Sequence, residues 1–182
     1  MPSFIPASAL GKGGFAPPSE RVACGVIGLG AMGRGHFGFC LAEPAVELVA
    51  ICDVDRVRRE DCRQQADATY ANAGRTGYRC AAYNDYREML ERKDLDAVLI
   101  ATPDHWHALQ SVDAARAGKD VYCEKPISMT IEQGRRIVQV VRRHGCVFQT
   151  GTQYRSQPTI RRVCDFVRRG GLGKVKHVFT VW

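Results

Sequence analysis

A glycine-rich stretch near the start of the chain has the pattern of a phosphate-binding loop. Gly28, Gly30 and Gly33 form a G-x-G-x-x-G sequence in which Ala31 and Met32 stand between the last two glycines. It closes an apolar run and opens a helical pattern, which is the context in which such a loop binds dinucleotides. The first glycine permits a tight turn, the second lets backbone N–H groups approach a pyrophosphate, and the third lets helix and strand pack closely. The phosphates would lie at the positive end of the helix.

An acidic residue ends the next apolar run. Asp53 stands 53 − 28 = 25 positions after Gly28. A carboxylate here accepts hydrogen bonds from the adenosine ribose hydroxyls and repels a 2′-phosphate, so NAD is favoured over NADP. Arg56, Arg58 and Arg59 follow closely and could soften that preference, so NADP stays possible. A SAM-dependent methyltransferase also combines a glycine-rich loop with a downstream carboxylate, and these two features alone do not exclude one.

Two polar stretches follow later apolar runs: residues 101–107 read ATPDHWH and residues 123–126 read CEKP. Both are expected at the carboxyl ends of parallel strands, where open α/β sheets bind ligands. Lys125, beside a glutamate and a proline-stiffened turn, can exchange a proton with a substrate hydroxyl or carbonyl. It could equally be a surface lysine paired with Glu124. His105 and His107 form an H-x-H pair, but no third ligand stands at a sensible spacing, so no metal site is predicted.

Alternating strand and helix patterns surround these residues. Almost continuously apolar strands separated by amphipathic segments predict a parallel sheet covered on both faces, hence a doubly wound α/β fold of the Rossmann type. Strands are predicted at residues 22–28, 46–52, about 78–81, 97–101, 120–123, 146–149 and 175–182. Helices are predicted near residues 31–43, 55–67, 85–92, 105–117, 131–144 and 159–169.

These patterns divide the chain into three parts. Residues 1–20 are rich in Pro, Gly, Ser and Ala and are predicted to be a flexible leader. Residues 21–150 are predicted to form the NAD(P)-binding domain. Residues 151–182 are predicted to hold a linker helix and the first strand of an incomplete second α/β domain, because an apolar strand with nothing to pair with would leave an exposed edge. The chain alone is therefore expected to bind a dinucleotide without catalysing a reaction.

Composition excludes several classes of protein. Lys and Arg number 26 against 19 Asp and Glu, a net charge of +7. The arginine pairs repeat along predicted helix faces without interleaved aromatic residues, so they indicate solvated surfaces rather than a nucleic-acid partner. No window holds the roughly 18 apolar residues that a membrane span needs. The eight cysteines are scattered without a C-x-x-C pair, so neither a disulfide framework nor a zinc site is predicted.

Four motifs occur in order: GVIGLGAMGRGH, AICDVD, ATPDHWH and CEKP. Together they resemble the Gfo/Idh/MocA family, which includes glucose–fructose oxidoreductase and inositol dehydrogenase. The resemblance covers about residues 21–182, and the Glu-Lys-Pro motif is its most specific part. It implies an NAD(P)-dependent oxidoreductase that acts on sugars, polyols or their derivatives. Members join the Rossmann domain to a C-terminal domain whose open antiparallel sheet carries substrate residues and makes oligomer contacts, so a homo-oligomer is expected for the full-length protein.

The resemblance also implies roles for individual residues. Lys125 corresponds to the catalytic lysine, which also orients the nicotinamide. The stretch 149–155, with Gln153, would reach the boundary between cofactor and substrate. The family's other catalytic residues, typically an aspartate and a histidine of the second domain, would lie beyond residue 182. Residues implied to line the cofactor site are Thr102, Pro103, His107 and Glu124.

Localisation and reaction type remain open at this stage. Residues 3–11 look like the tail of a twin-arginine signal found in exported members, yet no charged or apolar segment precedes Ala7-Ser8-Ala9, so cytoplasm and periplasm are both possible. Hydride transfer between a C–OH group and NAD is the leading reaction. One alternative is an NAD-dependent glycosidase that uses transient oxidation, and another is a non-catalytic NAD-binding fragment or sensor.

Overall fold

The computed structural model describes residues 16–75 and 77–180, and the chain divides into two compact units, residues 1–150 and 151–182. Most of the predicted leader lies outside the described residues. Its last part contains η2, a single 3-10 turn at Pro18–Glu20. Among the described residues, the first unit carries nearly all of the sheet and five α-helices, and it is the unit that positions the candidate site.

The first unit is built on a six-stranded sheet with the spatial order β3-β2-β1-β4-β5-β6. The strand β1 pairs in parallel with β2 on one side and with β4 on the other, so the order along the chain reverses between β1 and β4. In open parallel sheets the crevice at such a reversal is where ligands bind. The strands are β1 Val22–Ile27, β2 Val46–Cys52, β3 Ala81–Tyr83, β4 Ala97–Ile100, β5 Asp120–Glu124 and β6 Phe148–Gly151.

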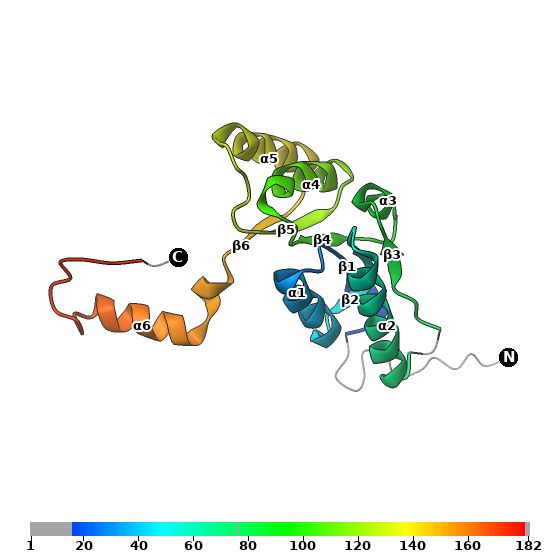
Figure 1. The fold of residues 1–182 in the computed structure, drawn as a ribbon, viewed down its shortest axis with the longest axis horizontal. Helices are drawn as coiled ribbons and strands as arrows, with labels where there is room; N and C mark the ends of the chain where they lie inside the picture. The colour runs from blue at the N-terminus through cyan, green and yellow to red at the C-terminus, as the bar shows by residue number, and fades with distance from the viewer. Residues whose placement is uncertain (1–15, 76, 181–182) are drawn as a thin grey trace. The chain divides into compact units, whose positions relative to one another are not determined.

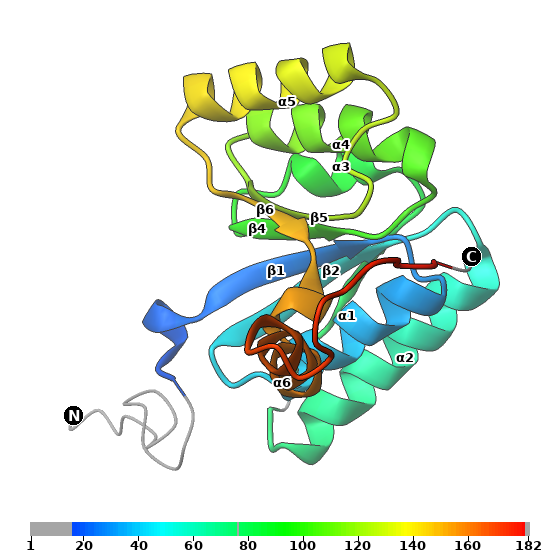
Figure 2. The ribbon, with the colours of Figure 1, turned by 90° about the vertical axis from the view of Figure 1, so that its left-hand side faces the viewer.

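Helices cover both faces of the sheet, which confirms the predicted doubly wound α/β fold. Figure 1 and Figure 2 show α1 and α2 on one face and α3, α4 and α5 on the other. Successive strand residues point to opposite faces, so Val26 packs with Phe37 of α1, whereas Ile27 packs with Met89 of α3. The helices of this unit are α1 Ala31–Ala42, α2 Arg56–Asn72, α3 Tyr86–Leu90, α4 Asp104–Arg116 and α5 Ile131–His144.

The helix starts differ in how their first N–H groups are satisfied. Asp55 caps α2, Asp85 caps α3 and Thr130 caps α5, each through a side-chain oxygen that accepts from a first-turn N–H. Gly30 begins α1 without a side-chain cap. The first-turn N–H groups of α1 are therefore available to an anionic ligand.

Two strands begin later than predicted. The third was expected at residues 78–81, but β3 starts at Ala81 because Tyr78 packs its ring on Tyr70, with centroids 4.0 Å apart, before the strand begins. The sixth was expected at residues 146–149, but β6 starts at Phe148, because Cys146 lies just after the end of α5, where its N–H donates to the Val141 carbonyl. In both places an apolar residue packs in a loop, a role that periodicity alone does not distinguish from a strand.

The second unit holds η3 Gln153–Ser156 and α6 Pro158–Arg168. The strand predicted at residues 175–182 is wrong for its described part, since residues 175–180 have no regular secondary structure. A strand exists only through pairing, and no hydrogen-bonded ladder reaches these residues within the described chain. In the part of the chain that is described, none of the helices combines the length and apolarity needed to cross a bilayer.

Thiol chemistry provides a test of this packing. All eight cysteines are free and six are buried, whereas Cys164 on α6 is exposed. Burial raises the pKa of Cys40, Cys52 and Cys80 to about 12. Because the thiolate is the reactive form, an alkylating reagent at pH 8 should modify Cys164 quickly and these three only after unfolding. Peptide mass spectrometry measures this, and fast labelling of Cys40 in the native protein would contradict the packing.

Candidate functional site

A cavity of about 720 Å³ opens beyond the carboxyl ends of β1, β2 and β4. Four separate segments form it: the glycine-rich turn after β1 and the residues after β2, β3 and β4. The structure therefore brings together stretches that are far apart in the sequence. The predicted site residues that line this cavity are Gly28, Gly30, Ala31, Met32, Asp53, Thr102 and Pro103.

The three glycines of the loop meet different constraints. Gly28 has a φ of +89°, and a Cβ there would lie 2.7 Å from the Ala101 carbonyl oxygen. A Cβ on Gly33 would lie 1.8 Å from the Gly28 carbonyl oxygen, so α1 approaches β1 too closely for any side chain. Around Gly30 the nearest atom is an Arg58 nitrogen, 3.9 Å away. Two glycines are thus required by packing, and the third leaves the backbone open to the cavity.

Asp53 does more in the structure than its position suggested. Its side chain is almost buried, and its Oδ2 accepts a 2.6 Å hydrogen bond from the Leu29 N–H inside the glycine-rich loop. Its Oδ1 accepts from the Asp55 N–H at 2.8 Å. Each carboxylate oxygen keeps a further lone pair, so the group can brace the loop and still accept from a ribose hydroxyl.

The three arginines after Asp53 separate in space. Arg59 turns behind the strand end, where its Nη1 donates to the Asp53 carbonyl and to Asn84 Oδ1. Arg56 does not line the cavity. Arg58 does line it, and its Nε lies 3.5 Å from Asp55 Oδ2 with half of the side chain exposed. Arg58 is therefore the arginine placed to meet a phosphate at the cavity mouth.

His107 lies behind the cavity wall rather than in it. It is 1% exposed, its Nε2 lies 2.7 Å from the Thr102 carbonyl oxygen and its Nδ1 lies 2.7 Å from the Pro126 carbonyl oxygen. The ring thereby ties the loop after β4 to the turn after β5. Both nitrogens are engaged by the backbone, so His107 acts on the site through Thr102 and Pro126. His105 points elsewhere and packs on Trp106, with ring centroids 5.9 Å apart.

The turn after β5 holds Glu124 and Lys125. Glu124 is 3% exposed; its Oε1 lies 2.8 Å from His36 Nε2, and its Oε2 accepts from the Lys125 N–H at 3.2 Å. The Lys125 side chain is exposed, and within the described chain no ion pair joins its ammonium to Glu124. This argues against the plain surface pairing of the two side chains. Neither residue lines the cavity, and Gln153 belongs to η3 of the second unit.

Several lining residues were missed by sequence reasoning. Asn84, Asp85 and Arg87 enter the cavity from the start of α3, directly after β3. The rule that ligands bind after strand ends would have found them if β3 had been placed at residues 81–83. Trp106 and Gln110 come from α4, and Gln110 Oε1 lies 2.6 Å from Thr102 Oγ1. Among the described residues, no three His, Cys, Asp or Glu side chains are grouped to hold a metal ion.

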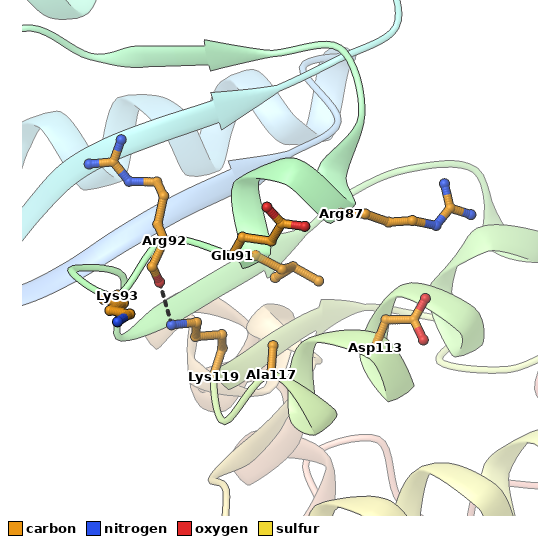
Figure 3. A pocket seen from close by; sticks show the side chains of 8 residues that line it. Arg87, Glu91, Arg92, Lys93, Asp113, Ala117 and Lys119 are labelled. Carbon is orange, nitrogen blue, oxygen red and sulfur yellow. Dashed lines mark hydrogen bonds between the residues drawn. The ribbon is translucent and has the colours of Figure 1, made fainter.

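A second cavity, of about 620 Å³, lies between α3 and α4, beside the residues that precede β4 and β5 (Figure 3). Its buried cation, Lys119, donates through Nζ to the Arg92 and Leu95 carbonyl oxygens at 2.6 and 2.9 Å. Figure 3 shows the Arg92 guanidinium turned away from Lys119. None of the predicted site residues lines this cavity. Seven of the predicted site residues line the first cavity, whereas Gly33, His107, Glu124, Lys125 and Gln153 do not.

Comparison with known proteins bears on the fold and the family. A family model described as "Oxidoreductase family, NAD-binding Rossmann fold" matches residues 22–152. The chain is 34% identical over 188 aligned positions to an alpha-N-acetylgalactosaminidase from Shewanella oneidensis, an alignment that covers 96% of this chain and 38% of that protein. The chain thus spans well under half the length of this relative.

Two solved structures have a similar fold. Scyllo-inositol dehydrogenase from Lactobacillus casei, with NAD(H) and scyllo-inositol bound, superposes with a TM-score of 0.71 at 26% identity, covering 85% of this chain and 43% of that one. A 3-ketoreductase from Actinomadura kijaniata, in complex with TDP-benzene and NADP, superposes with a TM-score of 0.70 at 28% identity, covering 82% and 44%.

Proposed function

The chain belongs to the Gfo/Idh/MocA oxidoreductase family, and we propose that it forms the cofactor half of an enzyme that transfers hydride between NAD and a carbon of a sugar, polyol or derivative. The cofactor is NAD, with NADP as the alternative. The observation that carries the proposal is the glycine-rich turn, where Gly33 lets the uncapped start of α1 approach β1 and open onto the cavity. A pyrophosphate fits that place because α1 offers N–H groups and the positive end of its dipole.

The residues that would hold the cofactor follow from the geometry of the cavity. Gly28, Gly30 and the first turn of α1 would bind the pyrophosphate, and Asp53 would accept from the adenosine ribose. Thr102 and Pro103 would form the wall towards the nicotinamide. His107 and Glu124 would hold that wall and the neighbouring turn in place. Residues 21–150 would thus form the cofactor domain, and residues 151–182, with Gln153, would begin the substrate-binding part.

The catalytic role goes to Lys125. NAD, when bound, would supply the hydride acceptor for the substrate carbon. The hydroxyl proton must leave as well, and the Lys125 amine, which follows β5, would accept it and would return it in the reverse reaction. The lysine would also orient the nicotinamide. A homo-oligomer is proposed for the whole protein on the same family grounds.

A second candidate is an NAD-dependent glycosidase. It is favoured by the alignment with the galactosaminidase, which runs over 96% of this chain. Both reactions begin with hydride transfer to NAD, so the cofactor half of the enzyme would be the same. They differ in the fate of the hydride, which leaves as NADH in a dehydrogenase and returns to the sugar in a glycosidase.

One experiment tests the proposal and separates the two reactions. The protein that carries this chain is incubated with NAD and panels of polyols, sugars and aryl glycosides, while NADH absorbance and released aglycone are both recorded. NADH formed in step with product supports the dehydrogenase. Aglycone release that requires NAD but accumulates no NADH supports the glycosidase. Failure of the protein to bind NAD(H) in a fluorescence titration would overturn both.

Cofactor preference depends on Asp53. The unmodified protein should bind NADH more tightly than NADPH, because the carboxylate repels a 2′-phosphate. Asp53→Ala should reduce that preference. It should also lower the affinity for both cofactors, because the Leu29 N–H loses its acceptor. Asp53→Asn keeps one acceptor oxygen and is therefore the matched control for the hydrogen bond from the Leu29 N–H. Fluorescence titrations with both cofactors measure this, and equal or tighter NADPH binding by the unmodified protein would contradict the assignment.

A further inference from the structure

His36 of α1 contacts the turn that follows β5. Its side chain is 14% exposed, and its Nε2 lies 2.8 Å from Oε1 of Glu124, whose side chain is 5% exposed. Its ring also meets the Tyr122 ring edge-on, with centroids 5.1 Å apart and planes at 66°. In the tautomer that carries its proton on Nε2, His36 donates to the Glu124 carboxylate oxygen.

This contact joins two parts of the site that are distant in the sequence. Gly30 begins α1 at the phosphate loop, and His36 stands almost two turns further along the same helix. On the other side, the second carboxylate oxygen of Glu124 accepts from the Lys125 N–H. A single helix and two hydrogen bonds therefore connect the phosphate loop to the backbone of the lysine turn. His36 itself does not line the cavity.

We propose that His36 is a positioning residue, which holds Glu124 and through it the Lys125 turn in register with the phosphate-binding helix. The proposal rests on the proposed function, in which the Lys125 turn serves the nicotinamide end of the cofactor. A buried carboxylate that loses a charge-assisted donor must rotate or draw in water. The turn that it holds would then lose its place relative to α1.

This role differs from simple support of α1 in a way that can be measured. If His36 only stabilised the helix, its loss would disturb the phosphate loop and weaken every ligand that contains the pyrophosphate. If it positions the lysine turn, its loss should weaken only ligands that carry a nicotinamide. NAD and ADP-ribose differ by the nicotinamide alone, so the ratio of their affinities reports on the turn.

The test uses the protein that carries this chain with two substitutions at one position. His36→Phe keeps a ring for Tyr122 but removes the donor, whereas His36→Gln keeps a donor that can reach Glu124. By calorimetric titration, His36→Phe should lower NAD affinity about tenfold, the effect of one charge-assisted hydrogen bond, and change ADP-ribose affinity less than about twofold. His36→Gln should recover most of the loss.

Two further variants keep the test decisive. His144→Phe changes an exposed histidine at the end of α5 and should alter neither affinity. Glu124→Gln replaces the carboxylate while leaving His36 in place, and should show the same selective loss of NAD affinity if His36→Phe fails to fold. An equal loss for NAD and ADP-ribose, or no loss for either, would overturn the positioning role. An unmodified protein that binds neither ligand would instead refute the proposed function.

Discussion

Replacing Gly33 with alanine is expected to abolish measurable dinucleotide binding and to lower the free energy of unfolding by about 3 kcal/mol, the upper end for overpacking a tight contact. The added Cβ would lie 1.8 Å from the Gly28 carbonyl oxygen. The backbone sets the positions of both atoms, so no side-chain rotation can relieve the overlap. The start of α1 must move away from β1, which displaces the N–H groups offered to the pyrophosphate.

The same helix supplies the control. Gly35 lies two residues further along α1, and a Cβ there would meet nothing within 4 Å. Gly35→Ala should therefore keep cofactor affinity and raise stability by about 0.5–1 kcal/mol, since alanine is the better helix former. Urea denaturation and NADH fluorescence titration measure both variants. Unchanged NADH affinity in Gly33→Ala would refute the placement of the phosphates at this turn.

Lys125→Met is expected to reduce turnover of the whole enzyme by about 10²–10⁴-fold, the contribution typical of a positioned proton acceptor. Methionine keeps the length and apolar stem of the side chain but cannot carry the hydroxyl proton. NAD affinity should fall much less than turnover, because the phosphate loop and Asp53 are untouched. Steady-state kinetics on an identified substrate measure the turnover, and an NAD titration measures the affinity.

A matched lysine tests whether the effect is specific. Lys93→Met removes an exposed charge at the second cavity, which none of the predicted site residues lines, and should leave turnover unchanged. Near-normal turnover in Lys125→Met would reduce Lys125 to a structural residue. Loss in both variants would point to a general effect of charge. The expected loss applies to the dehydrogenase and the glycosidase alike, because both begin with removal of the hydroxyl proton.

Much of the fold could be predicted because its signals are local. The strand β2 and the helix α5 have the predicted bounds, since an uninterrupted apolar run and a capped amphipathic helix are each encoded by neighbouring residues. The strands that shifted, β3 and β6, are short and begin beside an apolar loop residue, and α2 runs five residues past its predicted end. The described part of the predicted last strand, residues 175–180, is not a strand, because strand formation depends on a partner that an apolar pattern does not specify.

The sequence by itself determined the fold class and the family. Each of the motifs that indicate them can be recognised from neighbouring residues alone: the glycine pattern, the acidic residue at a strand end and the Glu-Lys-Pro motif. Only the tertiary structure decided how these residues are used. It placed the Asp53 carboxylate on the Leu29 N–H, put His107 behind the cavity wall, and brought His36 onto Glu124, 88 positions away. Such contacts depend on how helices pack across a sheet, and that packing brings together residues whose separation along the chain carries no periodic signal.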